Sequence, residues 1–420
     1  MKKVLIIGHF WPYKREGSCR LLGLAKWLKE FGWQPIIITG PLNSKPNFDV
    51  RYVEIDYRSF LGFRTKKNIL GQMQNKAKEL SPKQKSFLKF IYNRLREIFA
   101  YPDEDKYWKK PVLKEANKII KSEKIDAIIS VWPLTSHVVA KELKNKYGIF
   151  WIADFPELWT QNCDYVYSRI RKFFERKLEL KTLSSADILT TISKPMANEL
   201  KELHKRKIVY TITHGFDPEE VNSPAVKLTP KFTITYTGQM YAGKRDPFKI
   251  LIALKSLISN GIIDPEDIEI RFYGPQYNEL EEEIKKQKLS SIVRQYGLIN
   301  REFSLLKQKE SQLLLLLNWE DENQKGVYTG KIFEYLAAKR PIIATGGFGN
   351  DVVEELLKET KAGVYASGVD DIKKHLTAFY SEYKKMGRVD FKGDIEKINK
   401  YNHREMAKKF SVVLNRFYEK

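Results

Sequence analysis

The sequence predicts an α/β protein with two doubly wound domains, each a parallel sheet covered by helices on both faces. Three observations lead to this fold class. Short apolar runs of strand length alternate with segments of helical periodicity. A polar stretch interrupted by prolines, about residues 217–231, breaks this alternation, which then starts again. The length of 420 residues also suits two domains.

The first domain opens in the order strand, loop, helix, strand. Residues 3–7 are an apolar run, and a polar loop containing Gly17 follows. Helical periodicity begins near Ser18 and ends at Gly32, after which residues 35–39 form the next apolar run. This order is typical of a doubly wound domain. Further strands of this domain are expected at 127–130, 150–153, 187–192 and 208–212.

Residues 60–122 are lysine-rich and mostly helical in pattern, and we interpret them as an insertion or a pair of long helices. An apolar stripe at helical spacing accompanies the bases at 83–96, as in helices that lie in a membrane interface. The alternative is that the stripe packs on the first domain and the lysines are solvated. Between 60 and 100 only Glu79 and Glu97 oppose ten bases: Arg64, Lys66, Lys67, Lys76, Lys78, Lys83, Lys85, Lys89, Arg94 and Arg96.

The second half repeats the alternation, and the predicted domains are 1–222 and 223–397, followed by a helical segment at 398–420. Apolar positions at helical spacing run from Asn402 to Tyr418 and support that last helix. Strands of the second domain are expected at 232–236, 268–273, 313–317, 342–344 and 364–365.

Composition narrows the class of protein. Hydrophobic residues make up 42% of the chain, but no run of 18 apolar residues occurs, so no transmembrane helix is expected. The start resembles a signal peptide only briefly, which favours the cytoplasm. Cys19 and Cys163 are far apart, and the histidines show no metal-ligand spacing, so neither disulfides nor a metal site is predicted. The net charge of +22 indicates an anionic partner: nucleic acid, a phospholipid surface or an anionic substrate.

The segment 330–344 carries the clearest functional pattern. Gly330 permits a tight entry into a short amphipathic helix, and Pro341 precedes a buried strand. Lys331 and Glu334 are three residues apart and therefore lie on one side of the first turn. A carboxylate there can accept two hydrogen bonds from ribose hydroxyls, and a lysine beside a helix N-terminus suits a diphosphate. The alternative is a surface Lys–Glu pair.

Two glycine-containing loops at strand ends could also approach a ligand. Gly238 follows the strand at 232–236 and precedes Lys244 and Arg245, which together could cradle phosphates. The alternative is a glycine turn with a solvated basic pair. Gly17 would let a ligand approach the helix N-terminus that Ser18 caps, although the cap alone could explain Ser18.

Three polar residues follow two other expected strands. His137 comes after the strand at 127–130, and Asp154 and Glu157 come after the strand at 150–153. In doubly wound domains ligands bind at the carboxyl ends of strands, so these side chains could orient an acceptor hydroxyl or act as a base. A histidine that begins a helix is more often structural, and Asp154 could form a turn.

With these residues in place, the chain resembles the retaining GT-B-fold glycosyltransferases of the group 1 class, family 4. The resemblance is carried by Lys331–Ala337 and Pro341–Ala344 and extends over nearly the whole chain. It implies that Glu334 holds the ribose of a sugar nucleotide and that the C-terminal helix crosses back onto the first domain. Other matching stretches are the loop from Phe10 to Gly17, His214–Asp217, the diphosphate loop from Tyr236 to Arg245, and Gly274 with Gly297–Ile299, which would line the base.

One position departs from the family pattern. A second glutamate, eight residues before the ribose glutamate, usually touches the transferred sugar, and this chain has Gly326 there. Glu322 or Asn323 could take that role. The identity of the donor sugar is therefore left open.

The resemblance implies transfer of a sugar from a nucleotide diphosphate, UDP or GDP, to an acceptor hydroxyl with retention of configuration. Lys244, Arg245 and Lys331 would stabilise the departing diphosphate, so neither a metal nor a cofactor is expected. The expected acceptor is a lipid-linked saccharide at the inner face of an anionic membrane, and nucleic acid is not an expected partner. Two rivals remain: a GT-B sugar-nucleotide 2-epimerase, and a non-enzymatic basic protein that binds membrane or nucleic acid.

Overall fold

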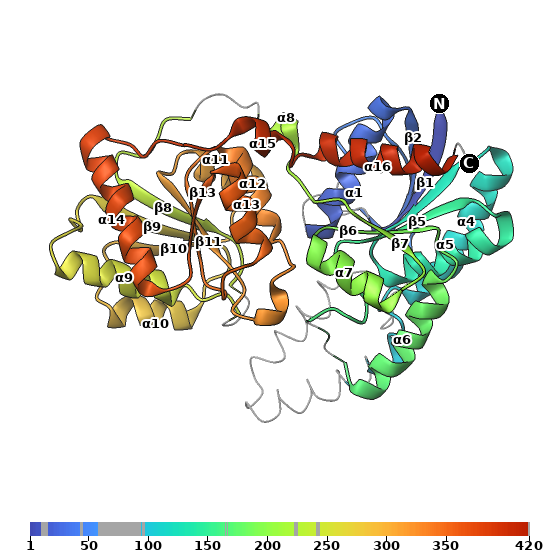
Figure 1. Cartoon of the computed structure of the whole chain (residues 1–420), viewed down its shortest axis with the longest axis horizontal. Helices are drawn as coiled ribbons and strands as arrows, with labels where there is room; N and C mark the ends of the chain where they lie inside the picture. Colours follow the sequence, from blue (N-terminus) through green and yellow to red (C-terminus); the bar gives the residue numbers. More distant parts are fainter. Residues whose placement is uncertain are drawn as a thin grey trace. The chain divides into compact units, whose positions relative to one another are not determined.

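The computed structural model describes residues 1–9, 16–42, 45–57, 94, 97–163, 165, 167–221, 226–240 and 244–418. The chain divides into two compact units (Figure 1). Unit 1 contains Met1–Thr213 and Met406–Lys420, and unit 2 contains His214–Glu405. Each unit holds one parallel sheet, so the predicted fold class of two doubly wound α/β domains is confirmed.

The observed boundaries differ from the predicted ones at 222 and 397. Residues 214–221 belong to unit 2 because the short helix α8, Pro218–Val221, packs against α12, Gly330–Ala338. Glu220 of α8 also forms an ion pair with Arg301, in which Oε2 and Nη2 are 2.6 Å apart. The proline-rich segment used to place the boundary therefore lies inside unit 2.

Unit 1 contains a seven-stranded sheet in the order β3-β2-β1-β4-β5-β6-β7, and every neighbouring pair is parallel. The strands are β1 Lys2–Ile7, β2 Trp33–Thr39, β3 Arg51–Glu54, β4 Ala127–Ser130, β5 Phe150–Phe155, β6 Ile188–Thr191 and β7 Ile208–Thr211. The helices are α1 Glu16–Trp27, α4 Lys109–Ser122, α5 Leu134–Tyr147, α6 Arg169–Leu183, α7 Lys194–Leu203 and α16 His403–Tyr418, with 3₁₀ turns at Leu28–Phe31 and Lys106–Trp108.

Two helices from opposite ends of the chain cover one face of this sheet. Leu21 and Leu24 of α1 and Phe410 of α16 share a core with Val4 and Ile6 of β1. Successive strand residues point to opposite faces, and Leu5 and Ile7 are also fully buried, so the sheet is covered on both sides. The C-terminal helix thus completes the core of unit 1, on which the resemblance had placed it.

Unit 2 contains a six-stranded parallel sheet in the order β10-β9-β8-β11-β12-β13. Its strands are β8 Phe232–Thr237, β9 Ile268–Tyr273, β10 Val293–Gly297, β11 Leu313–Leu317, β12 Ile342–Thr345 and β13 Gly363–Ala366. Its remaining helices are α9 Phe248–Ser259, α10 Asn278–Lys286, α11 Arg301–Lys309, α13 Val352–Thr360, α14 Val369–Met386 and α15 Ile395–Asn399, with a 3₁₀ turn at Glu322–Gln324.

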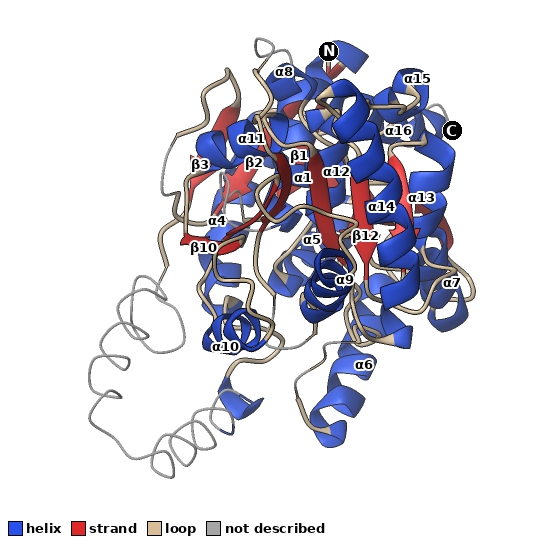
Figure 2. Cartoon of the chain, turned by 90° about the vertical axis from the view of Figure 1, so that its left-hand side faces the viewer, coloured by secondary structure: helices blue, strands red, loops and turns tan. Residues whose placement is uncertain are grey.

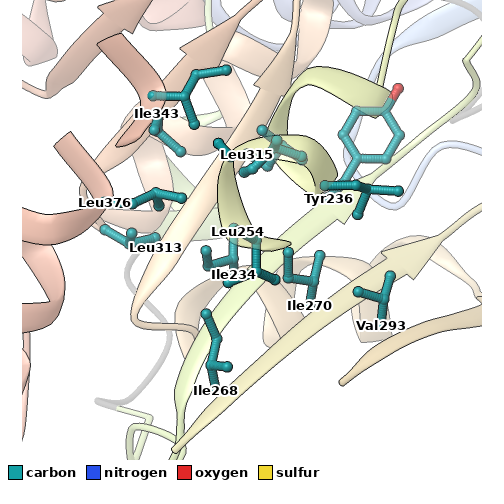
Figure 3. Packing of buried hydrophobic residues seen from close by; sticks show 14 of the residues in the cluster. Ile234, Tyr236, Leu254, Ile268, Ile270, Val293, Leu313, Leu315, Ile343 and Leu376 are labelled. Carbon is teal, nitrogen blue, oxygen red and sulfur yellow. The ribbon is translucent and has the colours of Figure 1, made fainter. Parts of the chain in front are cut away.

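Alternate residues of β11 divide the core of unit 2 into two layers. Leu313 and Leu315 face α9, α10 and α14, which lie in front of the strands in Figure 2, and the packing of this layer is shown in Figure 3. Leu314 and Leu316 face α12 and α13 on the opposite side. A run of five leucines buried on both faces is what a central parallel strand requires.

Two edge strands, β3 and β10, were not predicted. Arg51 and Glu54 of β3 are exposed, as are Arg294 and Tyr296 of β10, so neither strand contains a continuous apolar run. The predicted insertion at 60–122 also changes in part, because residues 109–122 form α4 in the connection between β3 and β4. Apart from Arg94, its basic amphipathic stretch at 83–96 lies outside the described residues. In the part of the chain that is described, no helix is long and apolar enough to cross a membrane.

Candidate functional site

Two glycines meet at the carboxyl ends of neighbouring strands in unit 2. Gly238 follows β8 with φ +150°, and Gly274 follows β9 with φ +154°. The Gly238 N–H donates to the carbonyl of Tyr273 at 2.7 Å. A Cβ atom on Gly274 would lie 2.0 Å from the carbonyl oxygen of Gly238, so the two backbones could not approach in this way with side chains present.

The side chain of Lys331 packs against Gly238. A Cβ atom on Gly238 would lie 1.7 Å from Cε of Lys331 and 2.6 Å from its Nζ, so the glycine leaves the space that the lysine occupies. Gly238, Gly274 and Lys331 were each predicted separately as donor-binding residues, and the structure brings all three together. Their role in binding a donor stays a prediction.

The start of α12 adds hydrogen-bond donors beside Lys331. Thr329 precedes the helix, and its buried Oγ1 has no hydrogen-bond partner among the described residues. The amide groups in the first turn of an α-helix lack carbonyl partners within the helix. A lysine, a hydroxyl and helix amides within one turn form an arrangement that suits an anionic group.

Glu334 is held in place through both of its carboxylate oxygens. Arg301 Nη1 donates to Oε1 at 2.7 Å, and Gln308 Nε2 lies 3.3 Å from Oε2. Gln308 also donates to Thr237 Oγ1, the residue before Gly238, at 3.0 Å. The Glu334 side chain is partly exposed, and a carboxylate can accept about four hydrogen bonds, so it keeps acceptor capacity for ligand hydroxyls.

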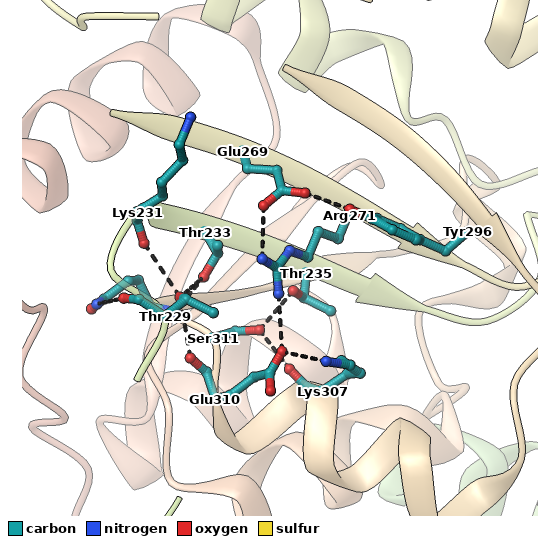
Figure 4. A network of polar contacts seen from close by, with 11 residues as sticks. Thr229, Lys231, Thr233, Thr235, Glu269, Arg271, Tyr296, Lys307, Glu310 and Ser311 are labelled. Atoms are coloured by element: carbon teal, nitrogen blue, oxygen red, sulfur yellow. Dashed lines mark hydrogen bonds and ion pairs between the residues drawn. The ribbon is translucent and has the colours of Figure 1, made fainter. Parts of the chain in front are cut away.

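A polar network anchors α11, the helix that carries Arg301 and Gln308 (Figure 4). Arg271 of β9 donates to Glu310 at 3.0 Å, and Lys307 donates to the same carboxylate oxygen at 2.8 Å. Ser311 donates to Thr235 of β8 at 2.6 Å. The end of α11 is therefore tied to the sheet, which fixes the position of Arg301 relative to Glu334.

Lys244 and Arg245, the basic pair after Gly238, differ in exposure, because Lys244 is exposed and Arg245 is buried. The Arg245 side chain is 2% exposed, and its guanidinium lies over the Trp319 ring at 4.6 Å from the centroid. Lys244 is exposed, with Nζ 5.7 Å from the same centroid. Lys244 can therefore reach a ligand from solvent, whereas Arg245 is packed against Trp319.

Gly17 and Ile299, two other predicted donor-binding residues, lie in different units. Gly17 is in the first turn of α1, and the loop before that helix lies outside the described residues. Ile299 is half-buried in the connection from β10 to α11, two residues before Arg301. The structure places Ile299 next to α11, the helix whose Arg301 and Gln308 contact Glu334. The contact of Ile299 with a base stays a prediction.

His137 is buried in the first turn of α5. Its Nδ1 lies 2.8 Å from Ser130 Oγ, and its ring stacks on Phe155 with centroids 4.4 Å apart. Burial lowers the pKa of His137 to about 3, so the imidazole is neutral at ordinary pH. These contacts favour a structural role, and the predicted catalytic role stays untested.

Asp154 is also fully buried and occupied by side chains of unit 1. Arg20 donates to it through Nε at 2.7 Å and Nη2 at 2.9 Å, and Thr190 Oγ1 donates at 2.6 Å. The pair joins α1 to β5, which explains the aspartate without a ligand. Glu157, three residues further along, is exposed. Glu157 therefore differs in exposure from the two buried residues with which it was predicted to act, and its own role stays a prediction.

Arg301 and Gln308 were missed as site residues by the sequence reasoning. Their spacing of seven places them on one side of α11, which is a weak signal, because many solvated helix faces have it. The partner that gives them meaning, Glu334, is 26 or more residues away in sequence. Only the packing of α11 beside α12 reveals the connection.

A second polar cluster was also missed, at the carboxyl end of β1. His9 is buried, with Nε2 3.4 Å from the Tyr57 hydroxyl, and Tyr57 donates to Asp105. The Trp108 ring meets His9 edge-on at 4.7 Å between centroids. Burial raises the pKa of nearby Asp103 to about 7, and the charge of Asp105 adds to this effect. Titratable groups thus gather at the sheet edge where ligands of this fold class bind.

Comparison with known proteins identifies the fold. No family model and no curated protein sequence matches the chain. Among solved structures, it is similar to sucrose-phosphate synthase from Thermosynechococcus elongatus, with 11% identity, full coverage of both chains and a TM-score of 0.62. It is also similar to a glycosyltransferase from Rickettsia africae, with 14% identity, 99% and 98% coverage and a TM-score of 0.61. A putative UDP-N-acetylglucosamine 2-epimerase from Listeria monocytogenes matches with 10% identity, 100% and 97% coverage and a TM-score of 0.56. At these identities the likeness shows the fold alone, which is GT-B.

Proposed function

We propose that the chain is a retaining glycosyltransferase that moves a sugar from a UDP or GDP donor to an acceptor hydroxyl. The observation that carries this proposal is the convergence of Gly238, Gly274, Lys331 and Glu334 at the strand ends of unit 2. These four residues supply bare backbone, a cation and an oriented carboxylate on one side of the sheet. That combination matches the diphosphate and the ribose of a sugar nucleotide.

In this proposal the nucleotide lies along the carboxyl ends of β8 and β9. Lys331, the amides of α12 and Lys244 stabilise the negative charge of the departing diphosphate, so side chains perform a role for which other enzymes use a metal. Glu334 accepts hydrogen bonds from the ribose, and Ile299 contacts the base. Arg245 supports the loop by packing on Trp319. The donor is the only nucleotide required, and no further cofactor is involved.

The acceptor side belongs to unit 1 in this proposal, and the acceptor is a lipid-linked saccharide in surface polysaccharide or glycolipid synthesis. Of the three residues predicted to act there, Glu157 is our strongest candidate for contact with the acceptor because it is the exposed one. His137 and Asp154 would act by holding the strand ends in position. The protein would work in the cytoplasm, on the inner face of an anionic membrane, without binding nucleic acid.

Calorimetric titration with UDP and GDP tests the donor site directly. Glu334→Ala should weaken binding of the preferred nucleotide by about 1.5–3 kcal/mol, the worth of hydrogen bonds to a charged group. Glu282→Ala on α10 is the matched control, because Glu282 is an exposed helix glutamate of the same unit. If neither nucleotide binds the wild type, or if both variants bind equally well, the donor-site assignment is wrong.

The epimerase alternative requires a separate measurement, because the same donor contacts would serve both activities. A glycosyltransferase releases nucleotide diphosphate in proportion to added acceptor, whereas an epimerase converts one sugar nucleotide into another without acceptor. Incubation with UDP-N-acetylglucosamine alone, followed by chromatography, separates the two. Formation of a second UDP sugar in that reaction would support the epimerase.

A further inference from the structure

The outward face of α6 in unit 1 combines apolar and basic side chains. Ile170, Phe173 and Phe174 are 73%, 57% and 54% exposed. Lys177 and Lys181 continue the same exposed stripe along the helix. In Figure 1, α6 lies at the lower edge of unit 1, on the opposite side from α16.

The two acidic residues of α6 are both turned inward and engaged there. Glu175 is buried and pairs with Arg171, whose Nε lies 2.6 Å from its Oε1. Glu179 is fully buried, accepts a hydrogen bond from the Thr160 hydroxyl and lies 3.4 Å from His204 Nε2. Because α6 contains no other carboxylate, its exposed side carries only positive charge.

A second exposed apolar pair lies beside the start of α6. Ile98 and Phe99 are 69% and 45% exposed. Arg171 Nη1 donates to the carbonyl of Glu97 at 2.7 Å, and the Tyr101 hydroxyl donates to the carbonyl of Phe174 at 3.0 Å. These bonds tie the segment 97–101 to α6, so its apolar side chains are presented together with those of the helix.

The aromatic and basic groups of α6 are interleaved. Lys177 Nζ lies 4.3 Å from the centroid of the Phe173 ring, and the rings of Phe173 and Phe174 meet edge-on with centroids 5.6 Å apart. Lysine and arginine near a membrane interact with anionic headgroups, while aromatic and aliphatic side chains enter the boundary with the acyl chains. A large exposed patch of this composition is uncommon on proteins that contact only water.

We propose that this docking patch, defined as Ile98, Phe99, Ile170, Phe173, Phe174, Lys177 and Lys181, binds the surface of an anionic phospholipid bilayer. The charge of α6 selects a bilayer over a second copy of this chain, because two copies of a face with only positive charge would repel each other. The inference rests on the proposed function in one respect, the purpose of the docking patch, which is to bring unit 1 to a lipid-linked acceptor. The patch consists of described residues and does not depend on the basic segment at 60–93.

Flotation of the full chain with phosphatidylglycerol vesicles tests the proposal, with phosphatidylcholine vesicles as the neutral surface. Wild type should float with the anionic vesicles and much less with the neutral ones, and added salt should release it. Phe173→Ser with Phe174→Ser, and separately Lys177→Glu with Lys181→Glu, should each lower the bound fraction at least about tenfold. All four side chains are exposed, so the fold should persist.

Two matched control pairs lie elsewhere in unit 1. Lys114→Glu with Lys121→Glu makes the same charge change on the exposed face of α4, and Ile208→Ser with Val412→Ser removes two exposed apolar side chains. Both control pairs should bind vesicles like the wild type. If the control pairs lose as much vesicle binding as the patch pairs, net charge or general apolar exposure governs binding, and the proposal is overturned.

Two further outcomes would overturn it. If the α6 pairs float like the wild type, bases outside the patch carry the binding. If Phe173→Ser with Phe174→Ser leaves flotation unchanged but converts a dimer to a monomer in analytical ultracentrifugation, the patch joins two copies of the chain. Nucleotide titration of the same variants separates this test from the donor site in unit 2. Loss of flotation with intact nucleotide binding supports the patch, whereas flotation without any nucleotide binding contradicts the proposed function alone.

Discussion

Replacement of Gly238 by alanine should damage the candidate donor site in a way that can be calculated from the structure. The new Cβ would lie 1.7 Å from Cε of Lys331, whereas carbon atoms in contact are about 3.5–4.0 Å apart. Lys331 must therefore move by about 2 Å, and its ammonium leaves its place over the loop. Loss of one charged hydrogen bond, worth about 1.5–3 kcal/mol, should weaken nucleotide diphosphate binding about 10- to 150-fold.

Gly261→Ala provides the control for backbone strain. Gly261 also has a positive φ, +68°, but a Cβ there would meet nothing within 4 Å. It should lower the free energy of unfolding by roughly 1–2 kcal/mol, the cost of a left-handed residue, and leave nucleotide binding unchanged. Urea denaturation and calorimetric titration of both variants measure the two effects. Nucleotide affinity in Gly238→Ala equal to that in Gly261→Ala would refute the placement of Lys331 at the diphosphate.

Three further results are expected. Arg301→Ala should weaken nucleotide binding about tenfold and reduce the affinity difference between UDP and 3′-deoxy-UDP, because Glu334 loses the cation that orients it. If calorimetric titration finds the same affinity difference in the variant as in the wild type, Arg301 does not orient Glu334. His137→Gln should make the free energy of unfolding less sensitive to acid. The wild-type imidazole has a pKa of about 3 in the folded protein and about 6.5 in the unfolded chain, so the wild type should lose roughly 1.4 kcal/mol of its free energy of unfolding per pH unit as the pH falls between these values. Urea midpoints of the two proteins that run parallel from pH 6.5 to 4 would contradict this prediction. Asp154→Ala should cost about 3–5 kcal/mol by leaving Arg20 buried without its carboxylate, and loss of less than about 1 kcal/mol in denaturation would contradict the buried pair.

The sequence was sufficient to predict most of the fold because central strands and amphipathic helices leave local patterns. β11 is a run of five leucines, and its prediction needed no knowledge of its neighbours. The edge strands β3 and β10 were missed because half of their residues face solvent and lack an apolar run. Boundaries were displaced for a different reason: prolines mark a break in pattern, but only the packing of α8 shows to which unit the segment belongs.

The arrangement of the candidate site could be anticipated where a local pattern points to a particular residue type at one position. Gly238, Lys331 and Glu334 were proposed from local patterns; the structure places Lys331 on Gly238 and links Glu334 through Gln308 to Thr237, the residue before Gly238. Arg301 could not be identified, because an arginine acquires significance only from its partner, here 33 residues away. The reverse happened with His137, whose position after a strand suggested chemistry, whereas its burial and its bond to Ser130 give it a structural explanation.

The position of α16 has a consequence for how the chain is made. Phe410 and Leu414 complete the same core as Val4 and Ile6, so β1 cannot finish its packing until a helix that is synthesised after unit 2 has been made. The chain of unit 2, residues 214–405, is continuous and can fold as soon as it has emerged. During the synthesis of unit 2, that face of the unit 1 sheet is therefore covered by α1 but not by α16, and the part that α16 will cover is where a chaperone would be expected to bind.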